Sequence, residues 1–180
     1  MSGRPRKQIW LLIALFFAPL ALAFLLYYGG GWRPPGSTNK GELISPPRPL
    51  PGVPDWHGKW VLVYVGDGRC DDRCRAALIL TRQTRLALNA DMTRVRRIFL
   101  ATDNCCDLAY LQAEHPDLSI VRAGDGVAAE LLAAFPDVGS GSIYIVDPLG
   151  NLMMRHAPSV GLSQDLLADL RKLLKLSHIG

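Results

Sequence analysis

The chain has 180 residues and a formal net charge of +4. Part of that charge is a short N-terminal group, Arg4, Arg6 and Lys7, so the net charge gives no reason to expect a nucleic-acid partner. Length and composition favour one small domain on a tether. The sequence contains no Ser/His/Asp arrangement, glycine-rich phosphate loop or paired catalytic carboxylates that could be picked out as an active site.

Residues 9–29 are the predicted transmembrane anchor. Residues 9–28 include no charged side chain, and about 20 such residues can span a bilayer as a helix. Because positive charge precedes this segment, residues 1–8 are predicted to be cytoplasmic and the rest exported, with the C-terminal domain on the periplasmic side of an inner membrane. A cleaved signal peptide is the alternative, since Ala21-Leu22-Ala23 offers a small-residue cleavage site. Both alternatives export the domain.

Residues 30–54 are rich in proline and glycine and show no apolar periodicity. Such a composition is typical of an extended linker. The folded domain is therefore predicted at residues 55–180.

Beyond the linker, predicted strands and helices alternate. Apolar runs predict strands at 60–65, 97–101 and 118–121, and helical periodicity predicts helices at 73–90, 107–114, 127–135 and 163–176. The turn signal Asp147-Pro148-Leu149-Gly150 predicts a hairpin between 142–146 and 152–155. This order, with two cysteines just after the first strand, predicts an α/β thioredoxin-like fold with a central mixed sheet flanked by helices.

Cys70 and Cys74 are the strongest candidates for chemistry. If the helix begins near Cys70, their spacing puts both sulfurs on one face of its first turn, where free backbone N–H groups favour a thiolate. Such a pair can close a disulfide, bind a soft metal ion such as Cu(I), or do both in different states.

Charged residues around the two cysteines act in opposite directions. Asp71 and Asp72 should oppose thiolate formation, whereas Arg69, Arg73 and Arg75 should favour it, and the balance stays open. A second basic group, Arg94, Arg96 and Arg97, is expected to form an ordinary solvated face.

Cys105 and Cys106 are candidate accessory thiols. They follow the second predicted strand, so they are expected at the same carboxyl edge of the sheet as Cys70. They could resolve or relay a disulfide, or add a sulfur ligand to Cu(I). The alternative is a structural disulfide between the two pairs, since exported cysteines tend to be oxidised.

Two segments carry a family resemblance. The string Gly58-Lys59-Trp60 to Gly66, followed by Cys70 and Cys74, and the string Ile143 to Gly150 are together similar to motifs of the Sco/SenC family of cytochrome c oxidase assembly proteins. The resemblance covers residues 56–174. It implies a thioredoxin-like fold, thiol or copper chemistry at Cys70 and Cys74, and a cytochrome c oxidase subunit or a copper chaperone as partner.

The chain departs from that family at its third copper ligand. The family's histidine falls at residues 138–141, where this sequence reads Val-Gly-Ser-Gly. His156 or His57 could replace it only if the fold brings either one to the dithiol. Weak or no Cu(II) binding is therefore expected, and no cofactor is required.

The sequence as a whole predicts a membrane-anchored, exported thioredoxin-like protein. The resemblance implies that it assists assembly of the cytochrome c oxidase copper site, through thiol–disulfide exchange at Cys70 and Cys74. The alternative is a non-enzymatic Cu(I)-binding or docking factor whose disulfides are structural.

Overall fold

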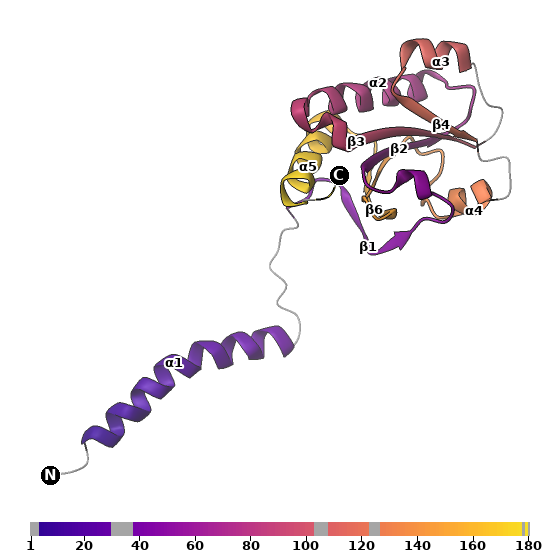
Figure 1. Cartoon of the computed structure of the whole chain (residues 1–180). Helices are drawn as coiled ribbons and strands as arrows, with labels where there is room; N and C mark the ends of the chain where they lie inside the picture. Colours follow the sequence, from indigo (N-terminus) through magenta and orange to yellow (C-terminus); the bar gives the residue numbers. More distant parts are fainter. Residues whose placement is uncertain (1–3, 30–37, 103–107, 123–126, 178, 180) are drawn as a thin grey trace. The chain divides into compact units, whose positions relative to one another are not determined.

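The computed structural model describes residues 4–29, 38–102, 108–122, 127–177 and 179, which fall into two units, Met1–Ser37 and Thr38–Gly180 (Figure 1). The first unit is the helix α1 (Arg4–Tyr28). Within it, Lys7–Tyr28 is long and apolar enough, by length and composition, to cross a membrane. No other helix in the described ranges meets that test. α1 therefore coincides with the predicted anchor.

The second unit is a six-stranded mixed sheet with the strand order β1-β6-β5-β2-β3-β4. β2, β3 and β4 are parallel to one another, whereas β5 runs antiparallel to β2, and β6 antiparallel to β5. The strands are β1 (Glu42–Pro49), β2 (Trp60–Gly66), β3 (Val95–Ala101), β4 (Leu118–Arg122), β5 (Ile143–Val146) and β6 (Asn151–His156). The α-helices are α2 (Asp72–Leu86), α3 (Leu108–Glu114), α4 (Val127–Ala133) and α5 (Leu162–Leu176). The predicted thioredoxin-like arrangement is confirmed.

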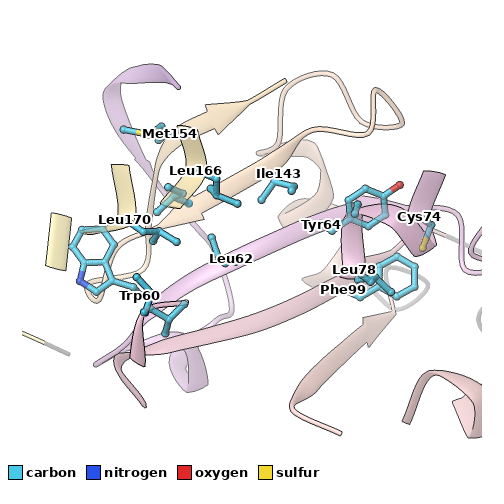
Figure 2. Close-up of a cluster of buried hydrophobic side chains, with 14 of the residues drawn as sticks. Trp60, Leu62, Tyr64, Cys74, Leu78, Phe99, Ile143, Met154, Leu166 and Leu170 are labelled. Carbon is cyan, nitrogen blue, oxygen red and sulfur yellow. The ribbon is translucent and has the colours of Figure 1, made fainter. Parts of the chain in front are cut away.

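The central strand β2 is buried along its whole length. Its alternate residues enter two hydrophobic clusters, because successive side chains of a strand point to opposite faces of the sheet. Trp60, Leu62 and Tyr64 pack with α2 and α5 on one face (Figure 2). Val61 and Val63 belong to the cluster on the other face, which includes Leu131 of α4 and Phe135. A continuous apolar run is typical of such a doubly covered strand.

The predicted linker extends too far into the domain. Glu42–Pro49 forms β1, which pairs antiparallel with β6, and Leu50 and Val53 are buried in the core. Prolines are tolerated because β1 is an edge strand and because Pro46 and Pro47 lie where its register with β6 shifts. The compact unit begins at Thr38, well before the predicted boundary at residue 55.

The prediction that Arg97 lies on a solvated face is also wrong. Its side chain is fully buried and bonds Asp117 Oδ1 at 2.9 Å, Thr81 Oγ1 at 3.1 Å and the Leu78 carbonyl at 2.6 Å. Burial lowers the pKa of Arg97, and the charge of Asp117 opposes that effect. A buried guanidinium requires a negatively charged partner. Here the partner is the carboxylate of Asp117, which directly precedes β4.

Candidate functional site

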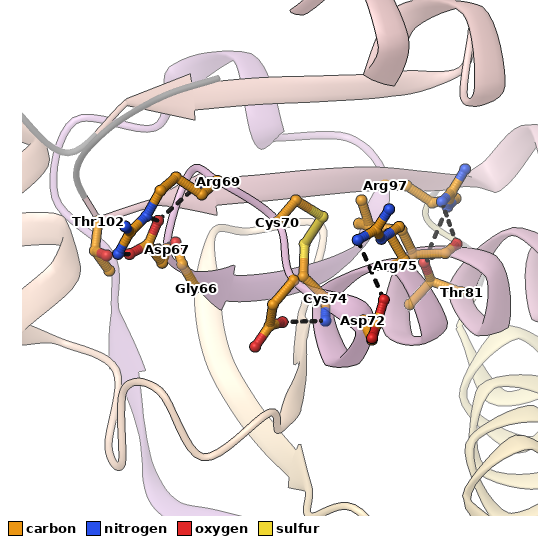
Figure 3. The surroundings of a disulfide bond; sticks show 12 residues. Gly66, Asp67, Arg69, Cys70, Asp72, Cys74, Arg75, Thr81, Arg97 and Thr102 are labelled. Atoms are coloured by element: carbon orange, nitrogen blue, oxygen red, sulfur yellow. Dashed lines mark hydrogen bonds and ion pairs between the residues drawn. A yellow bond between two sulfur atoms is a disulfide. The ribbon is translucent and has the colours of Figure 1, made fainter. Parts of the chain in front are cut away.

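Cys70 and Cys74 form a disulfide at the carboxyl end of β2 (Figure 3). Their Cα atoms are 5.0 Å apart. The prediction that these two sulfurs lie within bonding reach is confirmed. Open α/β sheets bind ligands at this edge, so the disulfide lies where the fold class places its chemistry.

The helix after the disulfide begins at Asp72, one residue before the predicted start at 73 but two residues after Cys70. Asp71 is the N-cap of α2, and its Oδ1 accepts a hydrogen bond of 2.9 Å from the Cys74 backbone N–H. Cys70 lies outside the helix with a φ of 49°. The two sulfurs therefore do not share a helix face as a pair of helical residues: Cys74 is in the first turn, and the loop brings Cys70 back to it.

The two cysteines differ in access. Cys70 is 7 % exposed and Cys74 is 2 % exposed. Cys70 also lines a pocket of about 240 Å³ whose other described lining residues are Gly68, Arg69, Arg75, Tyr110 and Leu111. Cys70 thus borders the pocket, whereas Cys74 is not among the described residues that line it.

Most charges around the disulfide are paired. Arg69 bonds Asp67 at 3.2 Å, and Arg75 bonds Asp72 at 3.1 Å (Figure 3). The hydrogen bonds from Arg69 lower the pKa of Asp67. Arg69 and Arg75, two of the three cations expected to favour a thiolate, are therefore each paired with a carboxylate.

Tyr64 lies under the same end of the sheet. Its residue is 4 % exposed, its ring centroid is 5.8 Å from that of Phe99, and in Figure 2 its hydroxyl points to the end of the cluster where Cys74 lies. Burial raises the pKa of Tyr64; the charge of Asp71 raises it further, and that of Arg73 lowers it. The hydroxyl therefore lies within electrostatic reach of the first turn of α2.

Neither candidate histidine completes a copper site. His156 is buried at 3 % exposure, and its Nε2 lies 3.3 Å from Asp169 Oδ2 of α5. The Asp169 carboxylate also accepts the backbone N–H of Gly41 at 2.8 Å. His57 precedes β2 and Cys70 follows it, so about 20 Å of strand, at ~3.3 Å per residue, separates them.

The loop that lacks the family's histidine packs against Arg73, the residue before Cys74. A Cβ on Gly141 would lie 2.9 Å from Arg73 Cδ, and Arg73 directly precedes Cys74. The loop position expected to carry the histidine is therefore a glycine that packs against the Arg73 side chain. Among the residues that the structure describes, no three His, Cys, Asp or Glu side chains gather as a metal site. These residues do not fit a Cys, Cys, His copper centre.

Cys105 and Cys106 lie outside the described residues. Their predicted role as accessory thiols, and their position relative to Cys70, stay predictions.

Sequence reasoning missed four features of the site. It did not single out Tyr64, the pocket at Cys70, the cap at Asp71 or the contact between Arg73 and Gly141. The cap had a local signal, because aspartate just before a helical pattern is a common N-cap. The contact between Arg73 and Gly141 had none, since the two residues lie far apart in the chain.

Comparisons with known proteins agree with this fold. Residues 60–177 match the family described as a transmembrane-like, thioredoxin-like, C-terminal domain. No curated protein matches the sequence significantly.

Solved structures show the same fold at low identity. Apo Sco1 from Thermus thermophilus is 20 % identical with a TM-score of 0.59, covering 77 % of this chain and 99 % of its own. Copper-bound yeast Sco1 is 17 % identical with a TM-score of 0.55, covering 68 % and 80 %. A thiol:disulfide interchange protein from Bacteroides sp. is 18 % identical with a TM-score of 0.50, covering 75 % and 90 %. The resemblance in fold to Sco proteins is confirmed.

Proposed function

Because this chain belongs to the family of transmembrane-like, thioredoxin-like C-terminal domains, we propose that it performs thiol–disulfide exchange at Cys70 and Cys74. The observation that carries this proposal is the unequal access of the two sulfurs. Cys70 borders a pocket, whereas Cys74 lies behind it at 2 % exposure. An exchange site needs one sulfur that meets the client and a second that resolves the mixed disulfide.

In the reducing direction the Cys70 thiolate attacks a client disulfide. One client sulfur leaves as a thiolate, and the other is held in a mixed disulfide with Cys70. The Cys74 thiolate then attacks Cys70 Sγ, the intermolecular bond breaks, and the client is released as a dithiol. The client gains the two electrons that Cys70 and Cys74 lose on forming their disulfide.

We further propose that α1 holds the domain on the periplasmic side of an inner membrane. Support comes from the charge asymmetry, since Arg4, Arg6 and Lys7 precede the apolar segment and positive residues favour the cytoplasmic side. A reporter fused after Leu50 should be active only if it functions outside the cytoplasm. Activity of a cytoplasm-restricted reporter at that position would contradict the orientation.

The proposed client is a cysteine pair of a cytochrome c oxidase copper site or of a copper chaperone. Support comes from the Sco-like motifs around Cys70 and Asp147 and from the Sco-like fold. The site lacks a third ligand among the described residues, which favours thiol exchange over Cu(II) delivery.

The alternative function is a docking scaffold with a purely structural disulfide, which the deep burial of Cys74 favours. Equilibration of the full-length chain in glutathione buffers separates the two functions. A reduction potential between about −180 and −270 mV supports exchange, whereas a potential below about −300 mV is typical of a structural disulfide and would reject it.

Trapping tests the assignment of the two cysteines. Cys74→Ser should accumulate a mixed disulfide between Cys70 and the client, because no resolving sulfur remains. Cys70→Ser, the matched variant, should trap none, since Cys74 does not border the pocket. Equal trapping by both variants would contradict the assignment of Cys70 as the attacking sulfur.

A further inference from the structure

Arg73 differs from the two arginines near it in sequence. Arg69 and Arg75 each bond a carboxylate, at 3.2 Å and 3.1 Å. In the described part of the chain, Arg73 makes no hydrogen bond and no ion pair. It is therefore a positive charge beside the disulfide that no local carboxylate neutralises by contact.

The fold packs the Arg73 side chain against the loop before β5. Its Cδ and Cγ lie so near the backbone of Gly141 that a Cβ there would be 2.9 Å and 3.4 Å away. The Arg73 charge also acts on the Tyr64 hydroxyl. Arg73 thus packs against the loop before β5, lies within electrostatic reach of the Tyr64 hydroxyl and directly precedes Cys74.

The Tyr64 hydroxyl is the second group, and it points to the end of the hydrophobic cluster where Cys74 lies (Figure 2). Gly66 leaves room for it, since a Cβ on Gly66 would lie 2.9 Å from Tyr64 Cε1 and 3.2 Å from its hydroxyl oxygen. Burial raises the pKa of Tyr64, so its hydroxyl keeps its proton and can donate a hydrogen bond.

We propose that Arg73 and the Tyr64 hydroxyl stabilise the Cys74 thiolate released when an incoming thiolate opens the disulfide at Cys70. The incoming sulfur forms a bond to Cys70 Sγ, the bond between Cys70 and Cys74 breaks, and its electron pair stays on Cys74 Sγ. A buried thiolate at 2 % exposure has little access to water, so a nearby cation and a hydroxyl donor replace the missing solvation. The inference rests on the proposed exchange function and assigns positioning residues to it.

The test is the rate at which dithiothreitol opens the disulfide in the full-length chain in detergent. This neutral dithiol serves as the probe because it needs no client-binding surface. Arg73→Gln should slow opening about fivefold, the effect expected for loss of one partly screened charge near the leaving sulfur. Arg73→Lys keeps the charge and should stay within about twofold of the unchanged chain.

Tyr64→Phe removes only the hydroxyl and should slow opening about tenfold, as expected for the loss of a hydrogen bond to a charged group. Both slow variants should also show a more negative reduction potential, which a purely structural change at a distance would not produce. Arg171→Gln, an exposed position whose guanidinium bonds the Ala87 carbonyl, is the control for loss of one positive charge elsewhere.

Opening rates of Arg73→Gln and Tyr64→Phe within twofold of the unchanged chain, with unchanged potentials, would overturn the inference. The exchange function and the roles of Arg73 and Tyr64 are tested by different measurements, so either can be rejected without the other. A potential below about −300 mV in the unchanged chain rejects the exchange function. Dithiothreitol rates still compare the variants in that case, so the roles of Arg73 and Tyr64 are decided independently.

Discussion

Arg73 packs against Gly141, a residue in the loop before β5 whose added Cβ would lie 2.9 Å from Arg73 Cδ. Gly141 has a φ of 80°, a conformation that side-chain-bearing residues rarely adopt. The contact joins the cation next in sequence to Cys74 to the loop before the hairpin string Ile143 to Gly150.

Gly141→Ala should displace Arg73 and slow disulfide opening. The left-handed backbone should also cost about 1–2 kcal/mol of stability. Gly139→Ala is a matched control, because its φ is 86° but its added Cβ would meet nothing within 4 Å. Denaturant titration should show similar destabilisation of both variants, and dithiothreitol kinetics should show slow opening only in Gly141→Ala. Equal rates would mean that Arg73 does not need this contact.

Asp71→Asn should speed disulfide opening. Asparagine caps helices about as well as aspartate, so the bond from the Cys74 backbone N–H is retained while a negative charge beside the leaving sulfur is lost. The opening rate should rise severalfold with little change in stability. Asp71→Ala, by contrast, should lose about 1 kcal/mol of stability through loss of the cap. A slower rate in Asp71→Asn would contradict the electrostatic explanation.

Asp117→Ala should destabilise the domain by about 3 kcal/mol, because it leaves the fully buried Arg97 charge without its carboxylate. Asp91→Ala removes the partner of Arg94 at a 52 % exposed carboxylate and should cost less than about 1 kcal/mol. Urea unfolding of both variants measures the difference. Similar losses would show that the Arg97 pair contributes no more than a surface pair.

Stability should fall as the pH drops from about 7.5 to 5.5. Burial lowers the pKa of both His115 and His156 below the ordinary value of 6.5, and for His115 the charges of Arg97 and Arg82 lower it further. The unfolded chain then binds protons more tightly than the folded chain, so each group can remove up to about 1.4 kcal/mol per pH unit below that value. The lowered pKa of Asp117 acts only at more acidic pH, near and below 3.8.

His115→Leu should reduce this pH dependence, because it removes a buried imidazole whose Nδ1 has no hydrogen-bond partner among the described residues. His57→Gln, at an exposed position, is the control and should leave the slope unchanged. Denaturant titrations at several pH values measure the slope. A slope that is the same in His115→Leu as in the unchanged chain would contradict the assignment.

The chain should bind Cu(II) weakly or not at all. Two thiolates without a nitrogen donor suit Cu(I) better, and His156 is engaged with Asp169. Electron paramagnetic resonance of the reduced full-length chain with one equivalent of Cu(II) tests this. A stoichiometric complex with a nitrogen ligand that His156→Ala abolishes would show that this histidine replaces the missing one.

The sequence by itself determined the elements that depend on local pattern. The apolar run of β2, the cysteine pair after it, the turn between β5 and β6 and the amphipathic α5 all follow from residues close together in the chain, and their order was enough to predict a thioredoxin-like fold. The potential anchor in α1 follows from composition alone.

The tertiary structure decided everything that depends on distant partners. The sequence of Glu42–Pro49 is typical of a linker, but in the structure this segment pairs with β6 as a strand. Arg97 was expected to be exposed, but in the structure it is buried and paired with Asp117. The access of Cys70, the burial of Cys74 and the approach of Arg73 to Gly141 likewise arise where separate segments pack together. Local sequence carries no signal for such contacts, because burial and pairing depend on which segments the fold brings together.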